Sequence, residues 1–62
     1  MTKTIITTTE FYSQYALINE AQRVIALVKV SNDNKSAYEV EMIDKAPSQL
    51  ISVFDYIRAN WR

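Results

Sequence analysis

Residues 23–43 read RVIALVKVSNDNKSAYEVEMI, and this stretch contains the pattern that decides the fold. Residues 23–30 are mostly aliphatic and β-branched, and residues 37–43 alternate between apolar and charged side chains. The segment between them, residues 31–36, reads SNDNKS. Asparagine and aspartate tolerate the left-handed backbone that tight turns require, and here they replace the glycine that the chain lacks. The stretch therefore predicts a β-hairpin with strands at 23–30 and 37–43.

The length of the hairpin loop decides which side chains share a face. With a loop of two or four residues, Leu27 lies opposite Val40 and Val28 lies opposite Glu39. A loop of odd length exchanges the facing of one strand relative to the other. The sequence leaves both registers open, and we take the even loop as the working prediction.

The two predicted strands differ in where they belong in a sheet. Residues 24–30 are apolar on both sides, which is typical of a central strand. Residues 37–44 alternate, with Glu39 and Glu41 on one side, which is typical of an edge strand that discourages pairing with other strands. The central strand then needs a neighbour on its other side, from the first twenty residues or from another subunit.

The C-terminal segment predicts an amphipathic helix that starts near Pro47, a residue favoured in the first helical turn, with Asp44 or Ser48 as a possible cap. At 100° per residue, one apolar stripe emerges. It consists of Leu50, Ile51, Val53, Phe54, Ile57 and Trp61. We expect this stripe to pack on the sheet, and a change of Phe54 to alanine to cost about 3–5 kcal/mol.

The first half of the chain supports two interpretations. Residues 4–18 fit a long, bent strand, with residues 19–22 as the turn into the central strand. Alternatively, residues 10–22 fit a helix with Thr7 and Glu10 as a capping box. We favour the strand, because it provides the central strand with a neighbour by the shortest connection. The predicted fold is a single α+β domain over residues 1–62, a three-stranded antiparallel meander packed on one C-terminal helix (β-β-β-α), with β-α-β-β-α as the alternative.

The 62-residue chain has no histidine, no cysteine and no glycine. Without histidine it has no side chain whose unperturbed pKa lies between about pH 5 and pH 8, and without cysteine it has no thiolate nucleophile or soft metal ligand. Without glycine it has no phosphate-binding loop of the Walker or dinucleotide type. We therefore expect a protein that is not an enzyme and that holds no cofactor and no metal ion.

Charge and hydropathy narrow the class of partner. Seven basic residues balance seven acidic ones, whereas proteins that bind nucleic acid or anionic membranes are usually basic. The longest apolar run covers residues 24–28, far short of a membrane span, and no signal-peptide core precedes it. We expect a cytoplasmic protein without a membrane segment.

The predicted sheet has two faces and only one helix to cover them. In the working register, Val24, Val28, Val30 and Ile43 lie on the uncovered face, and Tyr56 lies off the apolar stripe of the helix. An apolar patch bordered by charge indicates an interaction surface, and a two-fold dimer would bury it. These five residues form the candidate interaction surface. The sequence thus predicts a small, non-catalytic protein–protein interaction module, a homodimer that binds and modulates a protein partner.

The alternative is a nucleic-acid-binding module that uses the end of the predicted helix. Arg58 and Arg62 would contact phosphates, and Trp61 would stack on a base. The two functions differ in salt dependence, since nucleic-acid affinity falls steeply with salt and an apolar protein interface does not.

Overall fold

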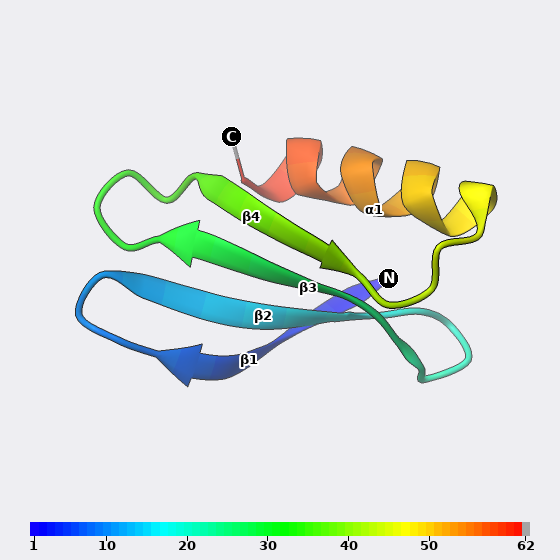
Figure 1. Cartoon of the computed structure of the whole chain (residues 1–62), viewed down its shortest axis with the longest axis horizontal. Coiled ribbons are helices and arrows are strands. Elements are labelled where there is room, and N and C mark those ends of the chain that lie inside the picture. Colours follow the sequence, from blue (N-terminus) through cyan, green and yellow to red (C-terminus); the bar gives the residue numbers. More distant parts are fainter. Residues whose placement is uncertain (62) are drawn as a thin grey trace.

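Four antiparallel strands in chain order form one sheet, and a single helix follows them (Figure 1). The structure, a computed structural model, describes residues 1–61. Its elements are β1 (Thr2–Thr8), β2 (Tyr12–Ile18), β3 (Val24–Ser31), β4 (Ala37–Met42) and α1 (Pro47–Asn60). The α+β class, the antiparallel meander and the C-terminal helix are confirmed. The count of three strands is wrong, and so is the alternative that placed a helix between the first two strands.

The additional strand arises from a turn at residues 9–11, within the segment predicted as one long strand. The hydroxyl of Thr9 accepts the backbone N–H groups of Phe11 and Tyr12 at 3.2 and 3.1 Å, and its Oγ1 also donates to the carbonyl of Tyr12 at 3.1 Å. A threonine side chain that bonds to nearby backbone competes with strand pairing and stabilises a turn. Because neither glycine nor proline marks this turn, the residue pattern did not reveal it.

The turn between β2 and β3 covers residues 19–22, as predicted. The side-chain oxygen of Asn19 accepts the backbone N–H groups of Ala21 and Arg23 at 3.0 and 3.1 Å. Gln22 adopts a left-handed backbone conformation with φ of 61°. A non-glycine residue in this region carries a steric cost, because its Cβ approaches the following carbonyl oxygen.

Next to the loop, the register between β3 and β4 is the predicted even-loop one, with Val30 opposite Ala37. The pairing then shifts past Tyr38, which is the additional residue of a bulge. Beyond the bulge Val28 lies opposite Val40 and Lys29 lies opposite Glu39, as an odd-length loop would place them, so the even-loop pairs predicted there are wrong. This register is favoured because it places the apolar residues of both strands on one face and the charged residues on the other.

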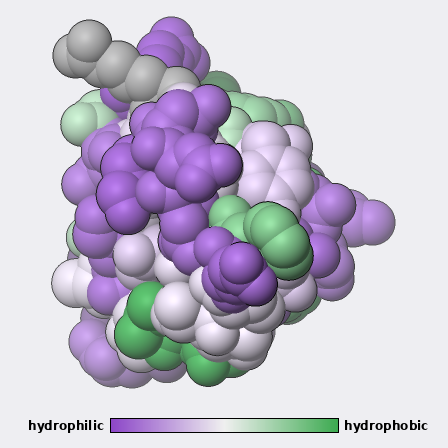
Figure 2. Space-filling model, turned by 90° about the vertical axis from the view of Figure 1, so that its left-hand side faces the viewer, coloured by the Kyte–Doolittle hydropathy of each residue, from purple (hydrophilic) through white to green (hydrophobic). Residues whose placement is uncertain are grey.

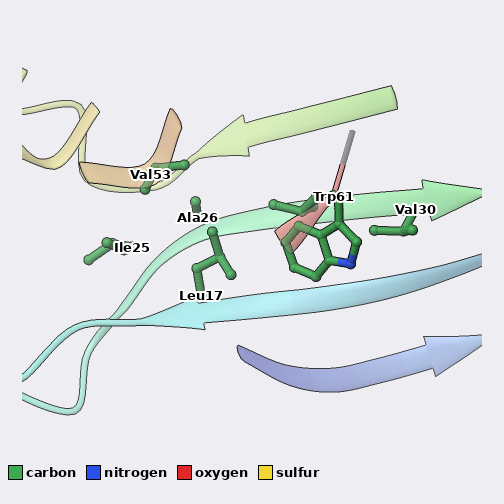
Figure 3. Packing of buried hydrophobic residues seen from close by; sticks show 7 residues of the cluster. Leu17, Ile25, Ala26, Val30, Val53 and Trp61 are labelled. Carbon is green, nitrogen blue, oxygen red and sulfur yellow. The ribbon is translucent and has the colours of Figure 1, made fainter. Parts of the chain in front are cut away.

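The core lies between α1 and one face of the sheet, which we call the helix face (Figure 3). The buried cluster consists of Leu17, Ile25, Ala26, Val28, Val30, Val53 and Trp61. The only residue of α1 itself that is buried is Val53, whereas Phe54 is 44% exposed. The prediction that Phe54 lies in the core is therefore wrong, whereas Val53, Ile57 and Trp61 of the predicted stripe lie in or against the core.

The connection from β4 to α1 is short and is anchored by hydrogen bonds. The backbone N–H groups of Ile43 and Asp44 both donate to the carbonyl of Ile25, at 2.8 and 3.1 Å. The carboxylate of Asp44 accepts the N–H of Ala46 at 3.0 Å, one residue before Pro47 begins the helix. The helix has no side-chain N-cap, so neither predicted capping residue acts as one. The short, anchored connection leaves the helix little freedom to turn Phe54 inward.

No element of residues 1–61 covers the opposite side of the sheet, which we call the open face (Figure 1). Ala16 pairs with Leu27 there, while the neighbouring pair of Tyr15 and Val28 points to the helix. Lys29 and Glu39 also lie on the open face and form an ion pair at 3.3 Å. The sheet therefore has one apolar, covered face and one mixed, uncovered face.

Candidate interaction surfaces

The structure does not bring the five residues of the candidate interaction surface together. Val28 and Val30 are buried in the core, on the side of β3 that the helix covers. Val24 is exposed at the start of β3, where it pairs with Ile18 on the open face, and Ile43 is exposed beyond the end of β4. Tyr56 is half-buried against Trp61, with 6.1 Å between the ring centroids.

The residues of the nucleic-acid alternative are also separated. Trp61 is 6% exposed and lies within the buried cluster (Figure 3). Its ring centroid lies 5.1 Å from that of Tyr15 on β2. Arg58 is exposed and pairs with Asp55 at 3.4 Å. Arg62 lies outside the described residues. A buried indole is not available to stack on a base.

The edge strand β1 is a feature that the sequence pattern did not identify. All seven of its residues are exposed, including Ile5 and Ile6 at 52% and 53%. Seen from the end of the molecule that carries the β1–β2 and β3–β4 loops, apolar atoms gather in the lower part, at the level of β1 (Figure 2). Lys3 is the single charged residue of the strand. A signal was present in the β-branched, almost uncharged run of residues 2–8, which is typical of a strand without charges that oppose pairing.

The two faces of β1 differ in the side chains they carry. Lys3 and Ile5 pair with residues of β2 that point to the helix face, and Thr4 pairs with Ala16 on the open face. The pairing with β2 then shifts past Ile6, which is the additional residue of a bulge. Because of this bulge, the regular part of the edge is the stretch before Ile6. On the helix face, the ammonium of Lys3 lies 4.7 Å from the ring centroid of Trp61.

The opposite edge, β4, carries charge. Glu39 and Glu41 are both exposed, and each pairs with a β3 residue on the open face. The hydrogen bond and charge of Glu39 raise the pKa of Lys29 above its ordinary value. The prediction that residues 37–43 form a charged edge strand beside a central strand is confirmed.

The outer side of α1 carries a second group of exposed apolar residues. Leu50 and Phe54 are four residues apart, so they lie on the same flank of the helix, and both are more than a third exposed. Ile51, on the side away from the sheet, is 63% exposed. We call Leu50 and Phe54 the helix flank.

The described residues show few features of a catalytic or metal-binding centre. Residues 1–61 enclose no pocket. They contain no group of three or more acidic side chains placed to hold a metal ion. Over the same range, α1 is neither long nor apolar enough to cross a membrane.

Comparisons with protein-family models, with curated proteins and with solved structures found no match for this chain. The inference of function therefore rests on the surfaces described above.

Proposed function

We propose that the protein is a small, non-catalytic protein–protein interaction module that forms a homodimer and binds and modulates a protein partner. The observation that carries this proposal is the number of large apolar side chains that remain more than a third exposed. Nine such residues are Ile5, Ile6, Phe11, Val24, Tyr38, Ile43, Leu50, Ile51 and Phe54.

The exposed apolar residues are expected to matter more in this protein than in a larger one. A domain of about 60 residues buries only about 60% of the surface that its unfolded chain exposes, so its stability is marginal. Contact with a second chain would remove part of the remaining apolar surface from water at about 25 cal/mol per Å². Two separate groups of exposed apolar residues, on β1 and on the helix flank, support both self-association and binding of a further protein.

Sedimentation equilibrium tests self-association directly. At tens of micromolar protein, we expect the mass of two chains. The mass should be the same at physiological salt and at several times the physiological salt concentration, because an apolar interface is insensitive to electrostatic screening. A mass of one chain throughout this range would contradict the homodimer.

Capture from lysate of the native cell tests partner binding, with the wild-type chain and a helix-flank variant as paired baits. We expect a discrete protein that is retained by the wild-type chain after nuclease treatment and lost with Leu50→Asp. Ser52→Asp, an exposed change on the other side of α1, serves as the matched control and should retain the protein. Recovery that disappears with nuclease would instead support the nucleic-acid alternative.

A further inference from the structure

We propose that two copies of the chain join through their β1 edges, so that their sheets continue as one antiparallel sheet across a two-fold axis at Thr4. This inference rests on the proposed function and deepens it, because it assigns the surface through which the protein pairs with itself. An edge strand presents backbone N–H and C=O groups that another extended strand can satisfy together. A second copy of this chain fits the outer edge of β1 both in the charge pattern of the strand and in its register.

The edge strand β1 is suited to pairing with another strand, above all in its regular part before Ile6. Its seven residues are all exposed, and no other part of residues 1–61 lies along its outer side (Figure 1). The strand is rich in threonine and isoleucine, which favour extended backbone. Apart from Lys3 it has none of the charges, and it has no proline, of the kind that usually protect an edge.

The other edge of the sheet, β4, does not suit a two-fold pairing. An antiparallel pair of β4 strands centred on Val40 would place Glu39 of one copy opposite Glu41 of the other, and like charges directly opposite one another are destabilising. Pairing of β1 with β4 of a second copy would leave one edge free at each end, so it would continue into a filament rather than close into a dimer. Pairing of β1 with itself avoids both problems.

The register of a β1–β1 pair is limited from both sides. A two-fold axis perpendicular to the sheet pairs residues that point to the same face, so it passes beside one residue and its copy. An axis at Lys3 would place two ammonium-bearing side chains opposite each other. An axis at Ile5 would pair Thr4 with the bulged residue Ile6, where the strand is irregular. The axis at Thr4 pairs residues 3–5 with regular strand residues of the second copy and reaches the bulged Ile6 only at the next pair, with Thr2.

The side chains fit this register on both faces. On the open face, Thr4 meets Thr4 of the second copy, and threonine pairs across strands form hydrogen bonds. On the helix face, Lys3 meets Ile5 of the second copy. The ammonium of Lys3 is directed to the ring of Trp61 of its own chain at 4.7 Å, so its methylene groups are available to cover the half-exposed isoleucine.

The expected affinity follows from the size of the contact. A standard interface buries about 800 Å² on each partner, and a short pair of edge strands is smaller than that. We therefore expect a dissociation constant in the micromolar range. This is the range in which single charge changes at the axis are readily measured.

The test places charge at the axis. Thr4 is exposed, so Thr4→Lys and Thr4→Glu are expected to leave the fold intact, as far-UV circular dichroism would show. Each variant alone should have a dissociation constant roughly tenfold weaker than the wild type, because the Cβ atoms of two like-charged side chains would lie about 5 Å apart across the axis and the threonine pair would be lost. An equal mixture of the two should recover a dimer, since opposite charges then meet. Glu41→Lys, a charge change on the other edge, serves as the control and should leave the mass unchanged.

Cysteine cross-linking tests the register independently. Because the chain has no cysteine, a single Thr4→Cys change can form a disulfide only between copies. Directly opposed strand residues have the Cα separation that a disulfide requires, about 4.4–6.8 Å. Mild oxidation should therefore convert most of this variant to a covalent dimer, whereas Glu39→Cys on β4 should give little.

The outcomes separate this inference from the proposed function. Loss of the dimer in both charge variants, recovery in the mixture and cross-linking at Thr4 together support the β1 interface. A wild-type dimer that persists unchanged in Thr4→Lys overturns this inference while leaving the proposed homodimer in place. A wild-type chain that remains a monomer overturns both, and partner capture then tests the remaining part of the function.

Discussion

Replacement of Trp61 by alanine should remove most of the stability of this fold. The indole closes the core at the end of α1, with 6% of the side chain exposed and ring centroids 5.1 and 6.1 Å from those of Tyr15 and Tyr56. The ammonium of Lys3 lies over the same ring. Alanine at this position would leave a cavity between the sheet and the helix and would remove these contacts together.

The expected magnitude follows from burial. Loss of a buried tryptophan costs about 3–5 kcal/mol, including the aromatic contacts. A domain of this length has a free energy of unfolding of about 3–9 kcal/mol, at roughly 0.05–0.15 kcal/mol per residue. Phe54 lies on the same helix but is 44% exposed, and about half of the transfer free energy of a phenylalanine is roughly 1 kcal/mol. Trp61→Ala should therefore cost several times as much as Phe54→Ala.

Urea unfolding followed by far-UV circular dichroism measures both variants, since fluorescence would be lost with the indole. All chains should be compared at one protein concentration, because self-association adds to the apparent stability. Trp61→Phe should recover part of the loss. Equal losses for Trp61→Ala and Phe54→Ala would refute the orientation of α1 described above.

Three further predictions concern the loops and the charged edge. Asn32→Ala should lower the free energy of unfolding, measured by urea titration, by about 1–3 kcal/mol. The Asn32 side chain accepts a hydrogen bond from the Ser13 hydroxyl and donates one to the carbonyl of Thr9, and so joins two loops. An equal loss in Asn34→Ala, which removes only a local hydrogen bond, would count against this bridge. Gln22→Gly should raise the thermal midpoint by relieving the left-handed conformation, with a free-energy gain of up to about 1 kcal/mol, and Gln22→Ala should not. Glu39→Gln should lower the pKa of Lys29 toward its ordinary value in an NMR titration, because the raised pKa reflects the ion pair with Glu39. The contribution of this ion pair to the stability of the fold is present at neutral pH and is lost as the pH rises through the folded-state pKa of Lys29. An unchanged pKa would show that Glu39 is not the cause.

The elements that the sequence predicted correctly are those with strong local patterns. The apolar run of β3, the alternation of β4 and the apolar stripe after Pro47 each indicate one type of structure, and each is present at close to the expected residues. The turn at residues 19–22 was also identifiable from Asn19. Periodicity over several residues, combined with turn-forming side chains, is sufficient to specify these elements.

The errors arose where one residue decided the outcome. The hydroxyl of Thr9 divides the first strand in two, and threonine at that position is as compatible with a strand as with a turn. The bulge at Tyr38 reverses the facing of the rest of β4 relative to β3, and a one-residue shift leaves the hydrophobic pattern of each strand unchanged. Val28 and Val30, which were predicted to lie on the interaction surface, are buried in the core. The exposed edge strand β1 was identified only from the topology of the sheet.

The chain-order topology of the sheet has a consequence for how the protein folds. Every strand pairs with the strand next to it in the chain, so each new pairing closes only a short loop. Loop-closure entropy is then small at each step, and proteins dominated by such local pairings fold faster than those that must join distant segments. We expect the sheet to assemble one hairpin at a time, and the refolding rate to exceed that of sheets of the same size in which distant strands must pair.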